Sequence, residues 1–434
     1  MAEREYHRLY RKEIKTMTER LPFSVEDAQH WREQFPTPFY IYDEAGIRKC
    51  VEELYRAFSW NPGFKEYFAV KATPTPAILR LLHSMGCGCD CASAPEVLMS
   101  RRCGIQGGEI MFSSNETRPE EYRVANGCGA IINLDDITQI EVLERACGIP
   151  ETVCCRFNPG TFRNTNDIMG HQYDSKFGMT RPQLFEALRT LRDRGAKRLG
   201  VHAMLASCSL DNGYYPALAR ELFALALELR KADIRLDFID LSGGLGIPYQ
   251  PWEKPVDIFA IGYGVRKVYE EMLSANGIEL SLFMEMGRYI TGPYGYLLTT
   301  AIGKKHIYKE YIGVDASASD LMRPAMYGAY HHITVLGKEY APADTTVDIV
   351  GSLCENNDKF AVNRPMPAVE DGDILVIQDA GAHGHAMGYN YNGRLRCAEL
   401  LMAPDRSVRM IRRAETVDDY FATLDVDEDF IKAT

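Results

Sequence analysis

The chain has 434 residues, of which 46% are hydrophobic, so it can bury a large core and has room for two domains. Its 60 acidic and 49 basic side chains give a formal net charge of −11. Because no block of basic residues offsets this charge, we do not expect nucleic acid or an anionic membrane as a partner.

The first 30 residues alternate charged and apolar positions and lack the apolar core of a signal peptide. No later stretch is long and apolar enough to span a bilayer. The 12 cysteines are too dilute for the disulfide framework of a small secreted domain. We therefore expect a cytoplasmic protein with reduced thiols.

Between residues 39 and 288 strand-like and helix-like segments alternate regularly. The helical patterns lie at 43–59, 76–85, 95–103, 119–125, 136–147, 182–194, 215–231 and 256–275. The strand patterns lie at 65–70, 87–92, 109–113, 130–134, 152–158, 199–204, 238–242 and 281–285. This alternation predicts a TIM-like (β/α)8 barrel that begins with a helix, with its chemistry at the carboxyl ends of the strands.

Three of the helical patterns begin with similar residues. A hydroxyl side chain, at Ser93, Thr117 or Thr180, comes two residues before a proline and three before a glutamate or glutamine. This arrangement predicts hydroxyl N-caps, with the carboxylate or amide reaching back to the cap.

After Arg288 the pattern changes to short β-rich segments separated by turn residues. We therefore predict a barrel domain at 36–292. A β domain of sandwich or barrel type is predicted at 293–434, together with the N-terminal residues 1–35.

Lys71 lies at the end of the first barrel strand, and after Ala72 the chain breaks at Thr73-Pro74-Thr75-Pro76. A lysine at the end of a strand is usually a solvated side chain. It can also be a Schiff-base lysine, whose amine becomes nucleophilic through partial desolvation and nearby positive charge. The lysine alone does not distinguish these two interpretations.

Two further motifs follow the seventh and eighth barrel strands. Ser242, Gly243, Gly244 and Gly246 form either a tight turn or a phosphate-binding loop. Glu285, Gly287 and Arg288 provide either a surface ion pair or a carboxylate for a pyridine nitrogen next to a guanidinium. An amine, a phosphate loop and a carboxylate are together what pyridoxal 5'-phosphate requires.

With these motifs, the chain resembles the fold-type III pyridoxal-phosphate amino-acid decarboxylases, and among them diaminopimelate decarboxylase most. The resemblance runs from about residue 36 to about residue 413 and rests on segments 67–72, 175–178, 242–246, 285–288, 320–327, 353–358 and 390–394. It implies a barrel followed by a β domain, as in alanine racemase and ornithine decarboxylase.

The resemblance also implies roles for individual residues. Lys71 would hold the cofactor covalently, and Cys354 would return a proton to the carbanion that decarboxylation leaves. The other cofactor-binding residues would be His202, Met204, Ser242, Gly243, Gly244, Gly246, Glu285, Gly287, Arg288 and Tyr391. Arg288, Arg323, Tyr327, Glu355 and Tyr391 would bind the substrate, and no metal is expected.

The implied reaction is decarboxylation of meso-diaminopimelate to L-lysine in lysine biosynthesis, by a homodimer with shared active sites. Two alternatives stay open. One is a decarboxylase of another diamino acid or of a carboxylated polyamine, such as ornithine, lysine, arginine or carboxynorspermidine. The other is a catalytically silent homologue that acts by binding.

The sequence departs from the family pattern at several positions. Met204 stands where relatives have a histidine stacked on the cofactor, Met286 where they have proline, and His383 where many have tyrosine. His383 is either a titratable group near the site or an exposed loop residue. Residues 207–215 do not match the usual loop, so the resemblance predicts cofactor use more firmly than substrate choice.

The segment Cys87-Gly88-Cys89-Asp90-Cys91 places thiols on alternate residues. Because no second ligand pair accompanies them at metal-site spacing, we expect small side chains that line the barrel interior rather than a zinc site.

Overall fold

The computed structural model describes residues 21–162 and 172–425. The chain divides into two compact units. The barrel unit comprises residues 47–247 and 254–290, and the β unit comprises residues up to 46, 248–253 and those from 291 onward. Among the described residues, no helix combines the length and apolar character needed to cross a membrane.

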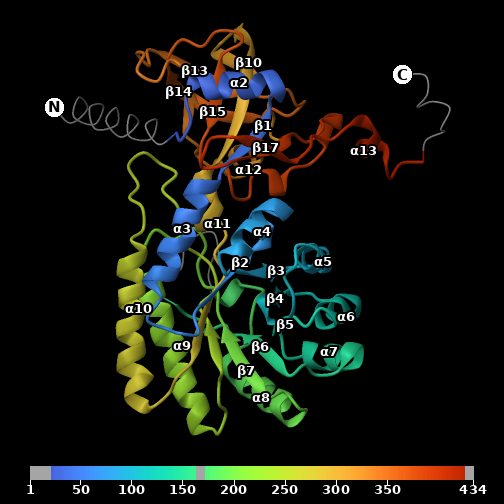
Figure 1. The fold of residues 1–434 in the computed structure, drawn as a ribbon, viewed down its shortest axis with the longest axis vertical. Coiled ribbons are helices and arrows are strands. Elements are labelled where there is room, and N and C mark those ends of the chain that lie inside the picture. The colour runs from blue at the N-terminus through green and yellow to red at the C-terminus, as the bar shows by residue number, and fades with distance from the viewer. Residues whose placement is uncertain (1–20, 163–171, 426–434) are drawn as a thin grey trace. The chain divides into compact units, whose positions relative to one another are not determined.

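In the barrel unit, parallel strands close into a barrel in chain order, which confirms the predicted fold (Figure 1). They are β2 (Lys65–Ala69), β3 (Gly88–Cys91), β4 (Ile110–Ser113), β5 (Ile131–Leu134), β6 (Thr152–Arg156), β7 (Arg198–His202), β8 (Phe238–Asp240) and β9 (Ser281–Met284). Each lies within a couple of residues of its predicted bounds, as expected where short β-favouring runs are bounded by turn residues.

The predicted helices are also confirmed, and several of them lie on the outside of the barrel in Figure 1. They are α3 (Glu44–Ala57), α4 (Pro76–Ser84), α5 (Ala94–Arg102), α6 (Pro119–Gly127), α7 (Gln139–Cys147), α8 (Arg181–Asp193), α9 (Tyr214–Lys231) and α10 (Ile258–Met272).

The helix starts differ in part from prediction. In α8 the Gln183 side chain reaches back to Thr180, whose N–H donates to Gln183 Oε1 at 3.0 Å. In α5 the Ser93 hydroxyl caps nothing. In α6 the proline is the first helical residue, so Arg118 rather than Thr117 is the N-cap. The prolines therefore indicate where each helix begins, but they do not determine which residue caps the helix.

The barrel interior is a packed hydrophobic core rather than a channel. The rings of Phe238 and Phe283 stack with centroids 4.7 Å apart. Gly200 allows this packing, because a Cβ there would lie 2.1 Å from the Phe238 ring. The core cluster consists of Tyr67, Met111, Ile131, Cys154, Phe238 and Phe283.

The prediction that the β3 cysteines line this interior is wrong. Cys91 Sγ lies 3.4 Å from the hydroxyl of Ser100 on α5, so this thiol faces the surrounding helices. Side chains alternate along a strand, and Asp90 takes the inward position between Cys89 and Cys91. Burial of the thiols raises the pKa of Cys89 to about 12.

The β unit contains one mixed sheet with the order β14-β13-β11-β10-β1-β16-β17, in which β15 pairs with β10 and β12. Its strands are β1 (Phe39–Asp43), β10 (Gly295–His306), β11 (Glu310–Val314), β12 (Ile333–Val335), β13 (Thr345–Val350), β14 (Lys359–Met366), β15 (Ile374–Ile377), β16 (Ala398–Met402) and β17 (Val408–Arg412).

An N-terminal segment also belongs to this sheet unit. Helix α2 (Val25–Gln34) places Ala28 and Trp31 in the same hydrophobic cluster as Leu298 and Leu400. Strand β1 pairs with β10 and β16, whereas a boundary at residue 36 would assign it to the barrel. The sequence of residues 39–43 is equally compatible with a strand of either domain, so only the strand pairing assigns β1 to the β unit.

Candidate active site

Lys71 lies just beyond β2, in a single 3-10 turn formed by Val70–Ala72. Its Nζ atom is 3.6 Å from Oδ2 of Asp90, which follows Cys89 on the neighbouring strand β3. The Lys71 side chain is 48% exposed, whereas the Asp90 side chain is only 1% exposed. The amine is therefore accessible to a small molecule while it is fixed by a buried carboxyl group.

The charges around Lys71 differ from those we predicted. Burial favours the neutral amine and Arg156 acts in the same direction, but Asp90 and Glu285 outweigh them and raise the pKa of Lys71. The nearby positive charge that we expected is present in Arg156, but its effect on the Lys71 pKa is outweighed by the two carboxyl groups. The Lys71 amine is therefore an ammonium ion, in contact with the Asp90 carboxyl group. Burial in turn raises the pKa of Asp90, to about 8.

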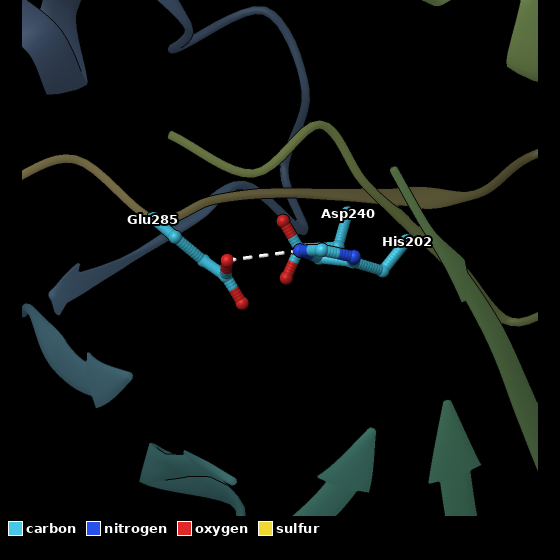
Figure 2. A group of neighbouring side chains, drawn as sticks. All are labelled: His202, Asp240 and Glu285. Atoms are coloured by element: carbon cyan, nitrogen blue, oxygen red, sulfur yellow. Dashed lines mark hydrogen bonds and ion pairs between the residues drawn. The ribbon is translucent and has the colours of Figure 1, made fainter. Parts of the chain in front are cut away.

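Glu285 follows β9 and hydrogen-bonds to His202, with Asp240 beside them (Figure 2). His202 Nε2, at the end of β7, is 3.0 Å from Glu285 Oε2, and the Ser242 hydroxyl donates to the same oxygen at 2.9 Å. The Ser113 hydroxyl donates to Oε1 at 3.3 Å. Burial alone would raise the pKa of Glu285, but His202, Lys71 and Ser242 together lower it, so the group is a carboxylate.

Asp240, the last residue of β8, completes this group. Its Oδ1 accepts the Ser242 N–H at 2.7 Å. Burial, and then the charge of Glu285, raise the pKa of Asp240 well above its usual range, which favours its protonated form. One donor atom from each of His202, Asp240 and Glu285 lies within 4.8 Å of the others, a spacing that a metal ion also accepts. Glu285 is the carboxylate of this group, and a carboxylate suits a protonated pyridine nitrogen.

The glycines after β8 pass so close to other backbone atoms that no side chain fits. A Cβ on Gly243 would lie 2.4 Å from the carbonyl oxygen of Glu285, and one on Gly246 would lie 2.7 Å from that of Cys208. Gly244 has φ +122°, where residues with a side chain are strained. Because no side chain intervenes, backbone N–H groups of this segment can approach a phosphate, although that of Gly246 donates to the carbonyl oxygen of Ser209.

The loop after β7, which includes Met204, is hydrogen-bonded to this glycine segment. Ser209 N–H donates to Gly244 O, and Gly246 N–H donates to Ser209 O, each at 2.8 Å. Leu205 N–H and Ala206 N–H both donate to the hydroxyl of Tyr214. Residues 207–215, which departed from the family pattern, therefore form part of the support of the predicted phosphate loop.

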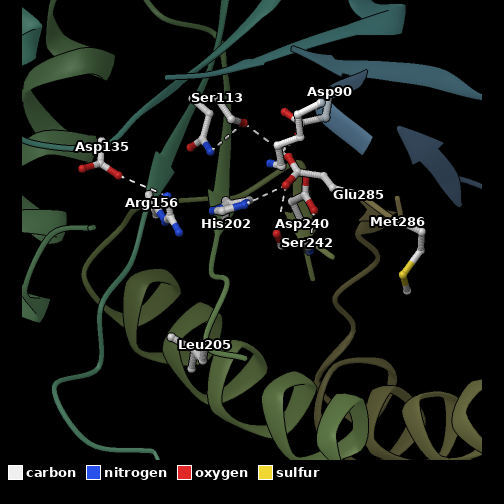
Figure 3. Close-up of polar contacts among 12 residues, drawn as sticks. Asp90, Ser113, Asp135, Arg156, His202, Leu205, Asp240, Ser242, Glu285 and Met286 are labelled. Carbon is white, nitrogen blue, oxygen red and sulfur yellow. Dashed lines mark hydrogen bonds and ion pairs between the residues drawn. The ribbon is translucent and has the colours of Figure 1, made fainter. Parts of the chain in front are cut away.

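Further residues that the sequence analysis did not select lie at the same ends of the strands (Figure 3). Arg156 ends β6, with Nη1 3.4 Å from Asp135 Oδ1 and its guanidinium over the Phe177 ring. Asn133 donates to the Ser113 hydroxyl at 3.2 Å. Asp90, Ser113, Asn133, Arg156 and Asp240 each end or nearly end a strand. This position was the signal that could have identified them.

Gly287 and Arg288 continue from Glu285. A Cβ on Gly287 would lie 2.8 Å from the Cβ of Ala72, so this glycine packs against the turn that carries Lys71. Arg288 begins the short helix α11 (Arg288–Thr291) and is partly buried. The barrel unit thus brings Lys71, His202, Ser242, the glycines, Glu285 and Gly287 to one end of the barrel.

The remaining predicted residues belong to the β unit, where Arg323 begins α12 (Arg323–Tyr327). Arg323 is 8% exposed and lies over the Tyr249 ring at 4.4 Å. Its Nη1 is 2.8 Å from His331 Nε2, while His331 Nδ1 is 2.8 Å from the carbonyl oxygen of Gln378. These partners fix its guanidinium. Tyr327 is 62% exposed.

Two loops of the β unit bring other predicted residues together. The N–H of Cys354 donates to Asn392 Oδ1 at 2.6 Å, which ties the Cys354–Glu355 loop to the turn that contains Tyr391. Cys354 and Glu355 are exposed and Tyr391 is half-exposed. His383 has φ 54° and is partly buried, so it is not the fully exposed loop residue that was one of its two interpretations.

Pyridoxal phosphate fits the barrel site by the chemistry of its residues. The accessible amine of Lys71 matches its aldehyde, the buried carboxylate of Glu285 matches its ring nitrogen, and the glycine segment matches its phosphate.

Comparison with known proteins agrees with this fit. Residues 45–292 match the family model described as pyridoxal-dependent decarboxylase, pyridoxal binding domain. Protein TabA of Pseudomonas amygdali pv. tabaci is 42% identical over 89% of this chain and 90% of its own length. Diaminopimelate decarboxylase of Methanothermobacter thermautotrophicus is 34% identical over 91% of this chain and 92% of its own.

Solved structures give the same result. Diaminopimelate decarboxylase from M. jannaschii in co-complex with L-lysine superposes with a TM-score of 0.85 at 28% identity, covering 93% of this chain and 95% of the other.

Proposed function

Because the chain belongs to the pyridoxal-dependent decarboxylases and is a pyridoxal-phosphate-dependent carboxy-lyase, we propose that its substrate is a diamino dicarboxylic acid. Our first choice is meso-diaminopimelate, which would give L-lysine and carbon dioxide for lysine biosynthesis in the cytoplasm. The observation that carries the proposal is the set of Lys71, Glu285 and the glycine segment at one end of one barrel.

Pyridoxal phosphate, when bound, supplies an electron sink for the carbon that loses its carboxylate. We propose that Lys71 holds its aldehyde, Glu285 its ring nitrogen, and Ser242, Gly243, Gly244 and Gly246 its phosphate. Asp90 in its ionised form, which is present above its raised pKa of about 8, would take the proton that Lys71 must lose to act as a nucleophile. Met204 would pack on the ring by dispersion without adding charge.

Substrate recognition would use residues of the β unit. A guanidinium held in place, as that of Arg323 is by His331 and Tyr249, suits a carboxylate. Arg288, Tyr327 and Tyr391 would assist it, and Glu355 would bind the distal amino group. Cys354 would protonate the reacting carbon, because an accessible thiol can donate and recover a proton near neutral pH.

We propose a homodimer in which each site takes its cysteine loop from the partner chain. The proposal is supported by the exposure of Cys354 and Glu355. Mixing Lys71→Ala chains with Cys354→Ala chains would then restore part of the activity, because one kind of site in the heterodimer has both residues intact. Heterodimers that form but stay inactive would contradict shared sites.

A second candidate substrate is another diamino acid or a carboxylated polyamine. The observation in its favour is that the 42% identical relative is named Protein TabA rather than diaminopimelate decarboxylase. The unusual loop at 207–215 and Met204 also favour it. Met204 keeps a catalytically silent relative as a third possibility, although Lys71, Glu285, Cys354 and Glu355 are all retained.

The test is carbon dioxide release from meso-diaminopimelate, set against D- and L-lysine, ornithine, arginine and carboxynorspermidine at equal concentration. We expect release from meso-diaminopimelate and formation of L-lysine. Release from another acid alone would replace the substrate, and release from none of them by pyridoxal-phosphate-loaded protein would support the silent homologue. Lys71→Ala protein serves as the blank.

A further inference from the structure

Glu66 is a buried acid near the start of β2, with 0% of its surface exposed. The next residue, Tyr67, belongs to the barrel interior, and alternation along the strand directs Glu66 to the opposite face. A carboxyl group buried between a strand and its surroundings is costly unless it makes a specific contact.

That contact is with Met286, the residue directly after Glu285. The Met286 N–H donates to Glu66 Oε1 at 2.7 Å. The Met286 carbonyl accepts the N–H of Ala69, also on β2, at 3.0 Å. Both backbone groups of Met286 are therefore bound to the strand that leads to Lys71.

The side chain of Met286 is fixed as well. It is 1% exposed, and its sulfur lies 3.7 Å from the hydroxyl of Tyr215 on α9. The contact with Glu66 nevertheless depends on the backbone alone, because any residue except proline supplies an N–H. A proline at position 286 would leave Glu66 Oε1 without this donor.

The surroundings of Glu66 favour its neutral form. Burial raises its pKa well above the usual range, and the nearby carboxyl groups of Glu285 and Asp90 act in the same direction. The Met286 N–H opposes this shift but does not reverse it. A neutral acid can accept the Met286 N–H through one oxygen without placing a second charge beside Glu285.

We propose that Glu66 is a positioning residue that ties the peptide after Glu285 to β2, and so holds the ring-nitrogen carboxylate in register with the Lys71 amine. The inference rests on the proposed roles of Lys71 and Glu285. It also gives a physical reason for Met286: the N–H that proline lacks is the group that Glu66 binds.

The test is a double-mutant cycle with Glu66→Leu, Met286→Pro and their combination, with Glu66→Gln as the conservative variant. Pyridoxal-phosphate affinity is measured by absorbance titration, and unfolding of the cofactor-free protein by urea. Losing the acceptor of a buried N–H leads us to expect about tenfold weaker cofactor binding for Glu66→Leu. Glu66→Gln keeps a neutral acceptor and should stay within about twofold of the parent.

In the Met286→Pro background, adding Glu66→Leu should change cofactor affinity by less than about twofold, because the N–H is already gone. An equal loss from Glu66→Leu in both backgrounds, or a Glu66→Gln variant as weak as Glu66→Leu, would overturn the inference. Should Glu66→Leu fail to fold, Glu66→Gln and Met286→Pro still decide: Glu66→Gln must match the parent and Met286→Pro must bind the cofactor more weakly.

Tyr55→Phe is the matched control. The Tyr55 hydroxyl lies 3.4 Å from the Glu66 backbone nitrogen but is no part of the contact with Met286. The double-mutant cycle repeated in the Tyr55→Phe background should therefore give the same coupling between positions 66 and 286. The urea cycle needs no cofactor. A parent protein that binds no pyridoxal phosphate would therefore refute the proposed function, while absence of coupling in urea would refute the role of Glu66 by itself.

Discussion

Replacing Gly243 with alanine tests whether the glycine segment after β8 is built for a ligand. The added Cβ would lie 2.4 Å from the carbonyl oxygen of Glu285, 1.0 Å inside the 3.4 Å at which ordinary contacts begin. The obstructing atom is backbone, so it cannot rotate away. Either the segment or the strand end that carries Glu285 must shift, and overpacking of this kind costs about 1–3 kcal/mol.

If that cost falls on the geometry that binds the cofactor, the dissociation constant of pyridoxal phosphate should rise about 5- to 150-fold. The assay is titration of cofactor-free protein with pyridoxal phosphate, followed by its absorbance. Gly127→Ala on α6 is the control, because nothing lies within 4 Å of its added Cβ. This control should bind the cofactor like the parent and gain a little helix stability.

An unchanged cofactor affinity in a folded Gly243→Ala protein would exclude a role of the glycine segment in binding the cofactor. The glycine segment would then be a tight turn without a binding role, which was its alternative interpretation.

Three other substitutions have defined outcomes. Arg412→Leu should destabilise the protein by about 1–3 kcal/mol in urea at pH 7, since buried Glu399 would lose the Arg412 guanidinium but keep His385 and the Tyr42 hydroxyl, whereas exposed Arg409→Leu should change little. Burial raises the pKa of Glu399, but His385, Arg412 and the Tyr42 hydroxyl together lower it below its usual value. The stability that the ion pair contributes is therefore present above the pKa of Glu399 in the unfolded chain and is lost as the pH falls through the lower folded value. A destabilisation by Arg412→Leu that is equal at pH 7 and at pH 3 would exclude the ion pair as its source. Lys71→Arg should retain no cofactor after borohydride reduction and dialysis, because a guanidinium forms no Schiff base, and retention equal to the parent would exclude Lys71 as the attachment point. Cys354→Ser should lower the rate of product formation at least about 10²-fold with little change in cofactor affinity, and an unaltered rate would remove Cys354 from proton transfer.

The barrel could be predicted because each of its elements has a local signal. β-favouring runs such as Phe238–Asp240 are bounded by turn residues, and prolines mark the helix starts. Strand β1 could not be assigned in the same way, since Phe39–Asp43 reads equally well as part of either domain. Its hydrogen bonds to β10 and β16 join segments far apart in the chain.

The site was predictable where a motif names its chemistry, as at Lys71, the glycine segment and Glu285. It was not predictable where the chemistry depends on neighbours. Asp90 lies between cysteines in the sequence and was given no role there, yet it raises the pKa of Lys71. Asp240 and Glu66 resemble ordinary strand residues in the sequence, and only their burial near Glu285 raises their pKa values well above the usual range.

The hydrogen bonds between Ser209 and the glycines at 244 and 246 have a consequence for protein engineering. The loop at 207–215 is an obvious target for changing substrate range, because it differs from the family pattern. Its backbone is joined to the segment proposed to hold the phosphate, so libraries that vary its length would select for cofactor retention at the same time. Changes to side chains that leave the Ser209 backbone in place offer a route by which specificity can be altered separately.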